Sequence, residues 1–87
     1  MSPPVVLYVT DWCPYCIRAK NLLSGKQVPF KEINVDDEPN MRQEMIARSG
    51  RRTVPQIFIG DQHVGGSDDL FALESSGELD KLLQGAK

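Results

Sequence analysis

The stretch that decides the fold is Trp12-Cys13-Pro14-Tyr15-Cys16, which contains both cysteines of this 87-residue chain. It follows Val5–Thr10, an apolar run rich in valine that is typical of a strand. It precedes Ile17–Leu23, whose apolar spacing predicts a helix that stops at Gly25. Cys13 is therefore expected at the N-terminal end of a helix, where unpaired backbone N–H groups and the helix dipole stabilise a negative charge.

The spacing of the two cysteines predicts redox chemistry. The thiolate is the nucleophilic form of cysteine, so the position of Cys13 favours an attacking thiol. Pro14 suits the first helical position, where an N–H would have no partner in any case. Cys16 lies one turn deeper on the same side, so its sulfur can reach that of Cys13 while being less exposed. The alternatives are two packed thiols or half of a zinc site, for which His63 is the only other candidate ligand of the usual kind.

Length and charge limit the classes of function. A chain of this length forms one small domain, and its net charge of −2 predicts no general affinity for nucleic acid or anionic lipid. No apolar run approaches the ~20 residues of a membrane span, and Met1–Pro4 lacks the features of a secretory signal. We therefore expect a cytoplasmic protein with no membrane partner, in which the two cysteines cycle between redox forms. Arg48, Arg51 and Arg52 form a local cluster that could bind a small anion.

The rest of the chain alternates between strand and helix signals. Val28–Val35 predicts a second strand, and the acidic residues and proline of Asp36–Pro39 predict the start of a helix that closes at Ser49-Gly50. Gln56–Ile59 is typical of a buried strand, which a turn at Gly60-Asp61 would connect to an antiparallel partner over residues 62–64.

Two helices are expected at the C-terminal end. Ser67 or Asp68 can cap the first, which breaks at Ser76-Gly77, and Glu78–Gln84 predicts a short last helix. The order β-α-β-α-β-β-α, with an extra terminal helix, predicts parallel first and second strands with a right-handed crossover. The hairpin then adds an antiparallel pair. The expected fold class is α/β, with a four-stranded mixed sheet flanked by helices.

Three motifs together resemble those of the dithiol glutaredoxins of bacteria. In chain order they are Cys13-Pro14-Tyr15-Cys16, Thr53-Val54-Pro55 and Gly65-Gly66-Ser67-Asp68-Asp69, and the resemblance extends from about Val5 to Leu83. It implies that residues 1–87 form a single glutaredoxin domain with the thioredoxin-like fold. It also implies a glutathione-dependent oxidoreductase that reduces protein disulfides and glutathione mixed disulfides.

The resemblance assigns roles to the two cysteines and names partners. Cys13 would attack the glutathione sulfur of a mixed disulfide, and Cys16 would resolve a disulfide formed with a protein substrate. Glutathione would be the reductant and co-substrate, with no metal. Glutathione reductase would act indirectly, through glutathione, and the other partners would be disulfide-containing or glutathionylated proteins. The protein would be a monomer.

A glutathione site follows from the same resemblance. It implies a cis bond before Pro55, with the Val54 backbone pairing with glutathione, and a helix N-terminus at which Asp69 accepts from the γ-glutamyl ammonium group. The full set of expected glutathione-binding residues is Tyr15, Arg42, Arg52, Thr53, Val54, Pro55, Gly66, Ser67, Asp68 and Asp69.

Two positions depart from the pattern of the relatives. Thr10 stands where many relatives have a lysine, so binding of the glutathione carboxylate would depend more on Arg42 and Arg52, or would be weaker. Ser67 stands where several have a cysteine, which removes a third oxidisable thiol.

Two other functions are compatible with the same motifs. One is an iron–sulfur carrier whose cluster is held by Cys13 of two chains and two glutathiones, although the rigid Pro14 argues against it. The other is a carrier reduced directly by thioredoxin reductase, which the intact glutathione-type motifs disfavour. Trp12 would either pack on the rim of the glutathione-binding groove or help to dock protein partners. His63 is expected to have a structural role.

Overall fold

The computed structural model describes residues 3–84, and its elements follow the order predicted from the sequence. They are β1 (Val5–Val9), α1 (Pro14–Gly25), β2 (Lys31–Asn34), α2 (Pro39–Ser49), β3 (Gln56–Ile59), β4 (Gln62–Gly65), α3 (Ser67–Ser76) and α4 (Glu78–Leu83). The second strand is shorter than expected, since it begins at Lys31 rather than Val28. Pro29 explains part of the difference, because proline has no N–H to donate to a ladder.

The four strands form one mixed sheet in the order β2-β1-β3-β4. β1 and β2 are parallel, with Val6 opposite Lys31, and they are connected through α1. β3 is antiparallel to both of its neighbours, β1 and β4. The predicted pairing is therefore confirmed, including the parallel first pair and the hairpin over β3 and β4.

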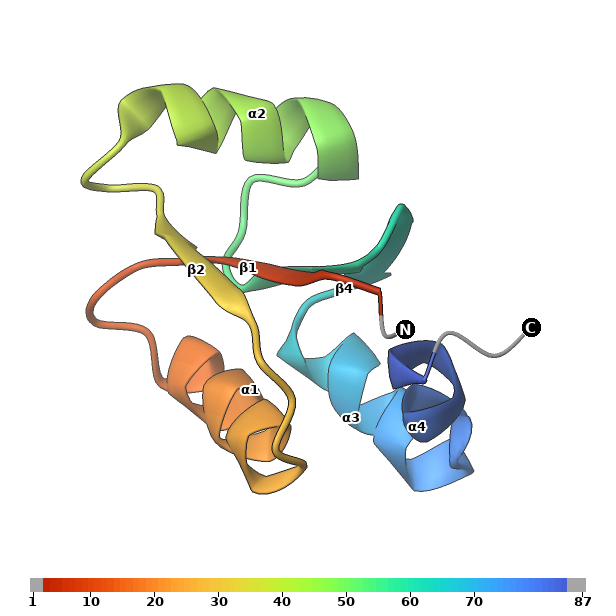
Figure 1. The fold of residues 1–87 in the computed structure, drawn as a ribbon. Coiled ribbons are helices and arrows are strands. Elements are labelled where there is room, and N and C mark those ends of the chain that lie inside the picture. Colours follow the sequence, from red (N-terminus) through yellow and green to blue (C-terminus); the bar gives the residue numbers. More distant parts are fainter. Residues whose placement is uncertain (1–2, 85–87) are drawn as a thin grey trace.

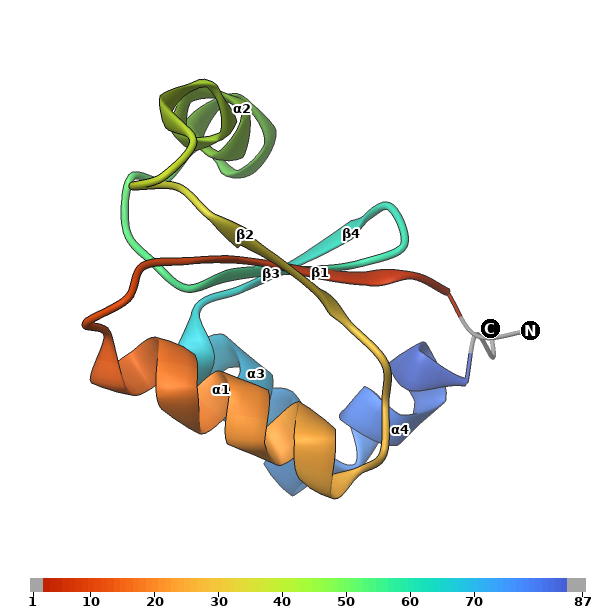
Figure 2. The ribbon, with the colours of Figure 1, turned by 60° about the vertical axis from the view of Figure 1, so that its left-hand side comes forward.

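The sheet is the middle of three layers, as Figures 1 and 2 show from two directions. α2 lies on one face, and α1, α3 and α4 lie on the other. β1 alternates accordingly: Val5, Leu7 and Val9 belong to the core that contains residues of α1, α3 and α4, whereas Tyr8 packs in a second core beside α2. Burial of a leucine side chain such as that of Leu7 stabilises the folded state by about 2 kcal/mol relative to an exposed leucine. The two cores thus fix which residues of β1 face each helix layer.

The ends of the helices agree with the sequence signals except at α3. Pro14 is the first residue of α1, and Gly50 ends α2 in the left-handed conformation with φ of 72°. α3, however, is capped by Gly66 and not by Ser67 or Asp68. The carboxylate of Asp69 reaches back to accept the Gly66 N–H at 3.0 Å, so a side chain inside the first turn replaces the expected cap.

None of the helices within residues 3–84 combines the length and the apolar character that crossing a membrane requires.

Candidate active site

Cys13 lies at the junction between β1 and α1, as its motif predicts. It is the N-cap residue of α1, with extended backbone angles, and its Sγ accepts a hydrogen bond from the backbone N–H of Cys16 at 3.1 Å. A hydrogen bond to sulfur strengthens when the acceptor is negatively charged. The site therefore provides a donor aimed at the thiolate form of Cys13, in addition to the helix dipole.

Cys16 occupies the first turn of α1 and is more buried than Cys13. Its exposed fraction is 0%, whereas that of Cys13 is 8%, and both cysteines are free thiols. Burial, followed by the hydrogen bond with Cys13, raises the pKa of Cys16 well above that of an ordinary thiol. Near neutral pH Cys16 is consequently a protonated thiol, and it is also the less accessible of the two cysteines.

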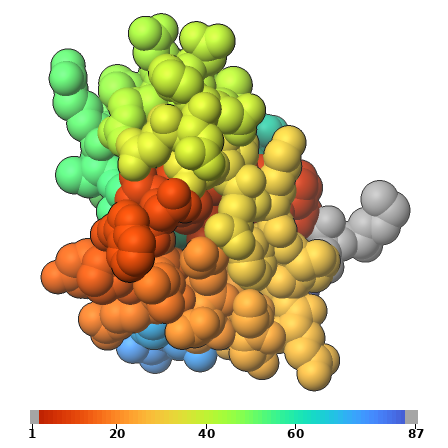
Figure 3. Space-filling view, turned by 90° about the vertical axis from the view of Figure 1, so that its left-hand side faces the viewer, coloured from red at the N-terminus to blue at the C-terminus, as the bar shows by residue number. Residues whose placement is uncertain are grey.

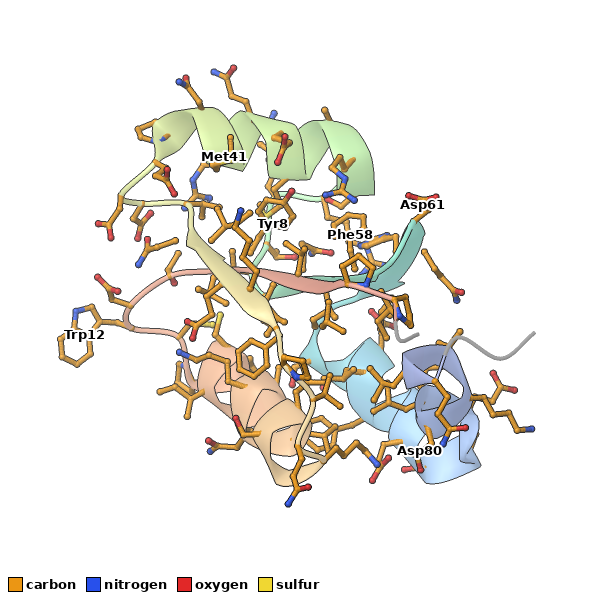
Figure 4. All side chains as sticks on the ribbon, viewed as in Figure 1. Tyr8, Trp12, Met41, Phe58, Asp61 and Asp80 are labelled. Atoms are coloured by element: carbon orange, nitrogen blue, oxygen red, sulfur yellow. The ribbon has the colours of Figure 1, made fainter. Side chains whose placement is uncertain are left out.

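The connection between β1 and α1 is exposed on one face of the molecule. Figure 3 shows it in red-orange, between the start of α2 above and α1 below. Trp12 belongs to this connection, is 96% exposed and points away from the body of the protein in Figure 4. Of the two environments considered for Trp12, packing on a groove rim is thus not the one observed.

A hollow of about 210 Å³ adjoins the cysteines. The segments that form it are the first turn of α1, the connection before β3 and the start of α3. Its lining residues are Tyr15, Arg51, Thr53, Val54, Pro55, Gly66, Ser67, Asp68 and Asp69. The carbonyl oxygen of Val54 lies 3.8 Å from Sγ of Cys13, which places the nucleophile beside this hollow. The Val54–Pro55 peptide bond is cis, as the resemblance implied.

All of the expected glutathione-binding residues line the hollow except two arginines. Arg42 instead pairs with Asp36 at 2.8 Å, and Arg52 is not part of the lining. Arg51 lines the hollow although the sequence did not single it out for this role. In the sequence, Arg51 stands out only as part of the basic cluster with Arg48 and Arg52. Such a cluster does not indicate which of its side chains faces a ligand.

Arg51 and Asp69 form an ion pair at the edge of the hollow. The Oδ2 atom of Asp69 lies 3.0 Å from Nη1 of Arg51 and also accepts the Gly66 N–H. The bond from Gly66, followed by that from Arg51, lowers the pKa of the Asp69 carboxyl below its usual value. These two hydrogen bonds therefore fix the Asp69 carboxylate beside the N-terminus of α3.

Gly65 is a further residue on which the site depends, and sequence reasoning gave it no individual role. Its φ is 118°, and a Cβ atom there would collide with the carboxylate of Asp69. Only glycine allows Asp69 to approach the chain so closely.

A larger groove, of about 590 Å³, lies near the start of β1 and includes residues of α4. Neither cysteine lines it, so it is remote from the thiol chemistry. Among residues 3–84, no group of three or more His, Cys, Asp or Glu side chains is arranged to hold a metal ion.

Comparisons with known proteins identify the family. The glutaredoxin family model matches residues 5–64. A glutaredoxin of Pseudomonas aeruginosa is 60% identical over 81 residues, which cover 93% of this chain and 96% of that protein. The chain belongs to the glutaredoxin family. It is therefore a glutathione-dependent thiol–disulfide oxidoreductase, with glutathione as co-substrate.

Solved glutaredoxin structures agree with the fold of this glutaredoxin. The solution structure of the Brucella melitensis protein has a TM-score of 0.86 and 53% identity, covering 99% of this chain and 94% of the other. The crystal structure of a buckwheat glutaredoxin–glutathione complex has a TM-score of 0.88 and 30% identity, and the match covers 95% of this chain and 78% of the buckwheat chain. The four-stranded mixed sheet is thus the thioredoxin fold of this family, as the sequence predicted.

Proposed function

We propose that Cys13 is the nucleophile and Cys16 the resolving thiol of this glutaredoxin. The observation that supports these roles is the asymmetry of the pair. Cys13 caps a helix and accepts the Cys16 N–H, whereas Cys16 is fully buried with a raised pKa. The attacking sulfur must be a thiolate near neutral pH, and the resolving sulfur needs to ionise only after the first disulfide has formed.

The monothiol route uses Cys13 alone. Its thiolate attacks the glutathione sulfur of a glutathionylated protein, the mixed disulfide bond breaks, and the protein thiolate leaves and takes up a proton. Cys13 is then disulfide-bonded to glutathione. A second glutathione thiolate attacks the glutathione sulfur of that disulfide, which releases oxidised glutathione and restores the Cys13 thiolate.

The dithiol route uses both cysteines on a protein disulfide. Cys13 attacks one sulfur of the substrate and forms a mixed disulfide, while the other substrate sulfur leaves as a thiol. Cys16 loses its proton and attacks the Cys13 sulfur, which frees the reduced protein and leaves a Cys13–Cys16 disulfide. Two glutathiones then reduce that disulfide and become oxidised glutathione.

The hollow beside Cys13 is the proposed glutathione site. The backbone of Val54 would pair with the extended tripeptide, as a strand edge pairs with a peptide. The N-terminus of α3 would hold the γ-glutamyl carboxylate, and Asp69 would accept from the ammonium group. Arg51 is the cation nearest to this end, since it lines the hollow. Arg42 and Arg52 remain proposed contacts for the glycine carboxylate.

Protein partners and cellular setting complete the proposal. The substrates would be disulfide-containing or glutathionylated proteins, and glutathione reductase would regenerate the glutathione. Residues 1–87 would act as a single monomeric domain in the cytoplasm, where free thiols such as these persist.

The two routes separate in a coupled assay with glutathione, glutathione reductase and NADPH. A glutathionylated peptide tests the monothiol route, and a protein with an accessible disulfide tests the dithiol route. Cys16→Ser should retain turnover of the peptide and lose that of the protein disulfide, whereas Cys13→Ser should lose both. Full activity of Cys13→Ser on either substrate would contradict the assignment of the nucleophile.

A further inference from the structure

A buried side chain behind the hollow binds the segment that forms its wall. Gln56 is the first residue of β3 and has an exposed fraction of 0%. Its Nε2 donates to two oxygens of Thr53, the carbonyl at 2.9 Å and the hydroxyl at 3.2 Å. Its Oε1 lies 2.7 Å from Nε2 of His63 on β4. Gln56 thus connects the hairpin to the residue that precedes Val54.

The orientation of this amide follows from its partners. The Thr53 carbonyl can only accept, so the NH₂ group of Gln56 must face it, and the amide oxygen of Gln56 must face His63. Nε2 of His63 must then carry a hydrogen. Burial, followed by the nearby charge of Arg51, lowers the pKa of His63, so a neutral ring protonated at Nε2 is the form expected near neutral pH. The hydrogen bonds of this chain therefore run from His63 to the Gln56 oxygen and from the Gln56 NH₂ group to Thr53.

The histidine ring is itself held in place. It stacks on Phe58 with a centroid distance of 4.8 Å and an interplanar angle of 30°. Phe58 packs edge-on against Tyr8, with ring centroids 5.8 Å apart. The guanidinium carbon of Arg48 lies 4.0 Å from the centroid of the Phe58 ring. Tyr8 and Phe58 lie between the sheet and α2 in Figure 4. The chain of contacts thus extends from α2 through two strands to Thr53.

We propose that His63 and Gln56 are positioning residues for the glutathione site. They orient Thr53 from behind, and through it they fix the Val54 backbone against Cys13 without lining the hollow themselves. The segment between α2 and β3 has no helix or strand of its own, so side-chain bonds must define its path. This inference rests on the proposed function, in which the Val54 backbone pairs with glutathione.

Two substitutions of His63 isolate the hydrogen bond. Leucine in His63→Leu fills part of the same space but cannot donate to Gln56, whereas the amide of His63→Gln can. The substitution removes one buried hydrogen bond, so we expect a rise of up to roughly tenfold in KM for a glutathionylated peptide. We expect kcat to change less, and His63→Gln to restore most of the loss in KM.

A control separates positioning from general stability. Met45 is fully buried in the same core beside α2, and it forms none of the contacts between His63 and Thr53. Met45→Ala should therefore lower the midpoint of urea unfolding at least as much as His63→Leu, yet leave KM unchanged. A KM that follows the unfolding midpoint across all three variants would overturn the proposal, as would a folded His63→Gln variant with the KM of His63→Leu.

Amide chemical shifts provide a readout independent of turnover. In ¹H–¹⁵N spectra, His63→Leu should move the Thr53 and Val54 signals, and His63→Gln should return them toward their wild-type positions. Titration with S-methylglutathione, which cannot react, should shift the Val54 signal in the wild type and require up to roughly tenfold more ligand in His63→Leu. Equal affinity of the wild type and His63→Leu for S-methylglutathione would reject the positioning role but leave the proposed glutathione site in place. No response of Val54 in the wild type would reject the proposed glutathione site and this inference with it.

Discussion

The carbonyl oxygen of Val54 lies 3.8 Å from Sγ of Cys13, although the two residues are 41 positions apart in the chain. β1 and β3 are hydrogen-bonded neighbours, and Cys13 follows the end of β1 whereas Val54 precedes the start of β3. Because the two strands are antiparallel, the end of one lies beside the start of the other. The pairing of these strands therefore brings the sulfur of the proposed nucleophile beside the backbone that is proposed to pair with glutathione.

The first prediction concerns selective alkylation of the two thiols. Iodoacetamide reacts with thiolates, and Cys16 is both buried and raised in pKa. Near neutral pH the reduced protein should therefore be labelled at Cys13 and not at Cys16, with Cys16 labelling only at strongly alkaline pH. Mass spectrometry of the peptides after a series of timed reactions measures this. Equal labelling rates near neutral pH would contradict the asymmetry of the pair.

Asp69 predicts a specific pH dependence of stability. Its pKa is lowered in the folded protein, so its charged form stabilises the fold fully above the usual carboxyl pKa. This stabilisation declines as pH falls through the folded-state pKa and is absent below it. Asp69→Asn should therefore cost roughly 0.3–1 kcal/mol near neutral pH. The difference should shrink in acid, as measured by urea unfolding at several pH values; a constant difference would contradict this reasoning.

Gly65→Ala should destabilise the protein and weaken the proposed site. The substitution requires a non-glycine residue at a φ of 118°, and its methyl group would displace the Asp69 carboxylate. We expect a loss of roughly 1–3 kcal/mol in the free energy of unfolding. Gly25→Ala is the matched control, because a Cβ atom at Gly25 meets nothing within 4 Å. The control should be neutral or stabilising by up to about 1 kcal/mol, and an equal loss in both variants would refute the explanation.

Thr10→Lys tests the departure of this chain from its relatives. A lysine three residues before Cys13 would add a cation where many relatives have one, and it should tighten binding of a glutathione carboxylate. An exposed pair contributes roughly 0.2–1 kcal/mol, so KM for glutathione should fall by a factor of up to about 5. The decrease in KM should become smaller at high salt, because salt screens the interaction between exposed charges. Thr10→Gln supplies an uncharged control of greater length than threonine, and the same gain in that variant would exclude a charge effect.

Most of the architecture could be predicted from the sequence because the signals were local. Gly50 and Gly77 end helices in the left-handed conformation, and Pro14 begins one. Cys13 and Cys16 were placed by the strand and helix patterns that flank them. These features depend on backbone geometry within a few residues, which residue type alone largely determines.

The parts that escaped prediction depend on contacts between distant segments. Nothing in the cluster of Arg48, Arg51 and Arg52 indicates that Arg51 pairs with Asp69, because that contact depends on the path of the chain after α2. The predicted N-cap of α3, Ser67 or Asp68, was wrong for a related reason. Asp69 was available to reach back to Gly66 only because Gly65 leaves room for its carboxylate.

Trp12 is the sole tryptophan of the chain, and it is almost entirely in contact with solvent next to Cys13. Its indole emission is therefore a built-in optical probe of events at the neighbouring sulfur. Attachment of a glutathione or arrival of a protein substrate would change the surroundings of a single fluorophore. Stopped-flow fluorescence could follow individual half-reactions of the unlabelled protein in real time.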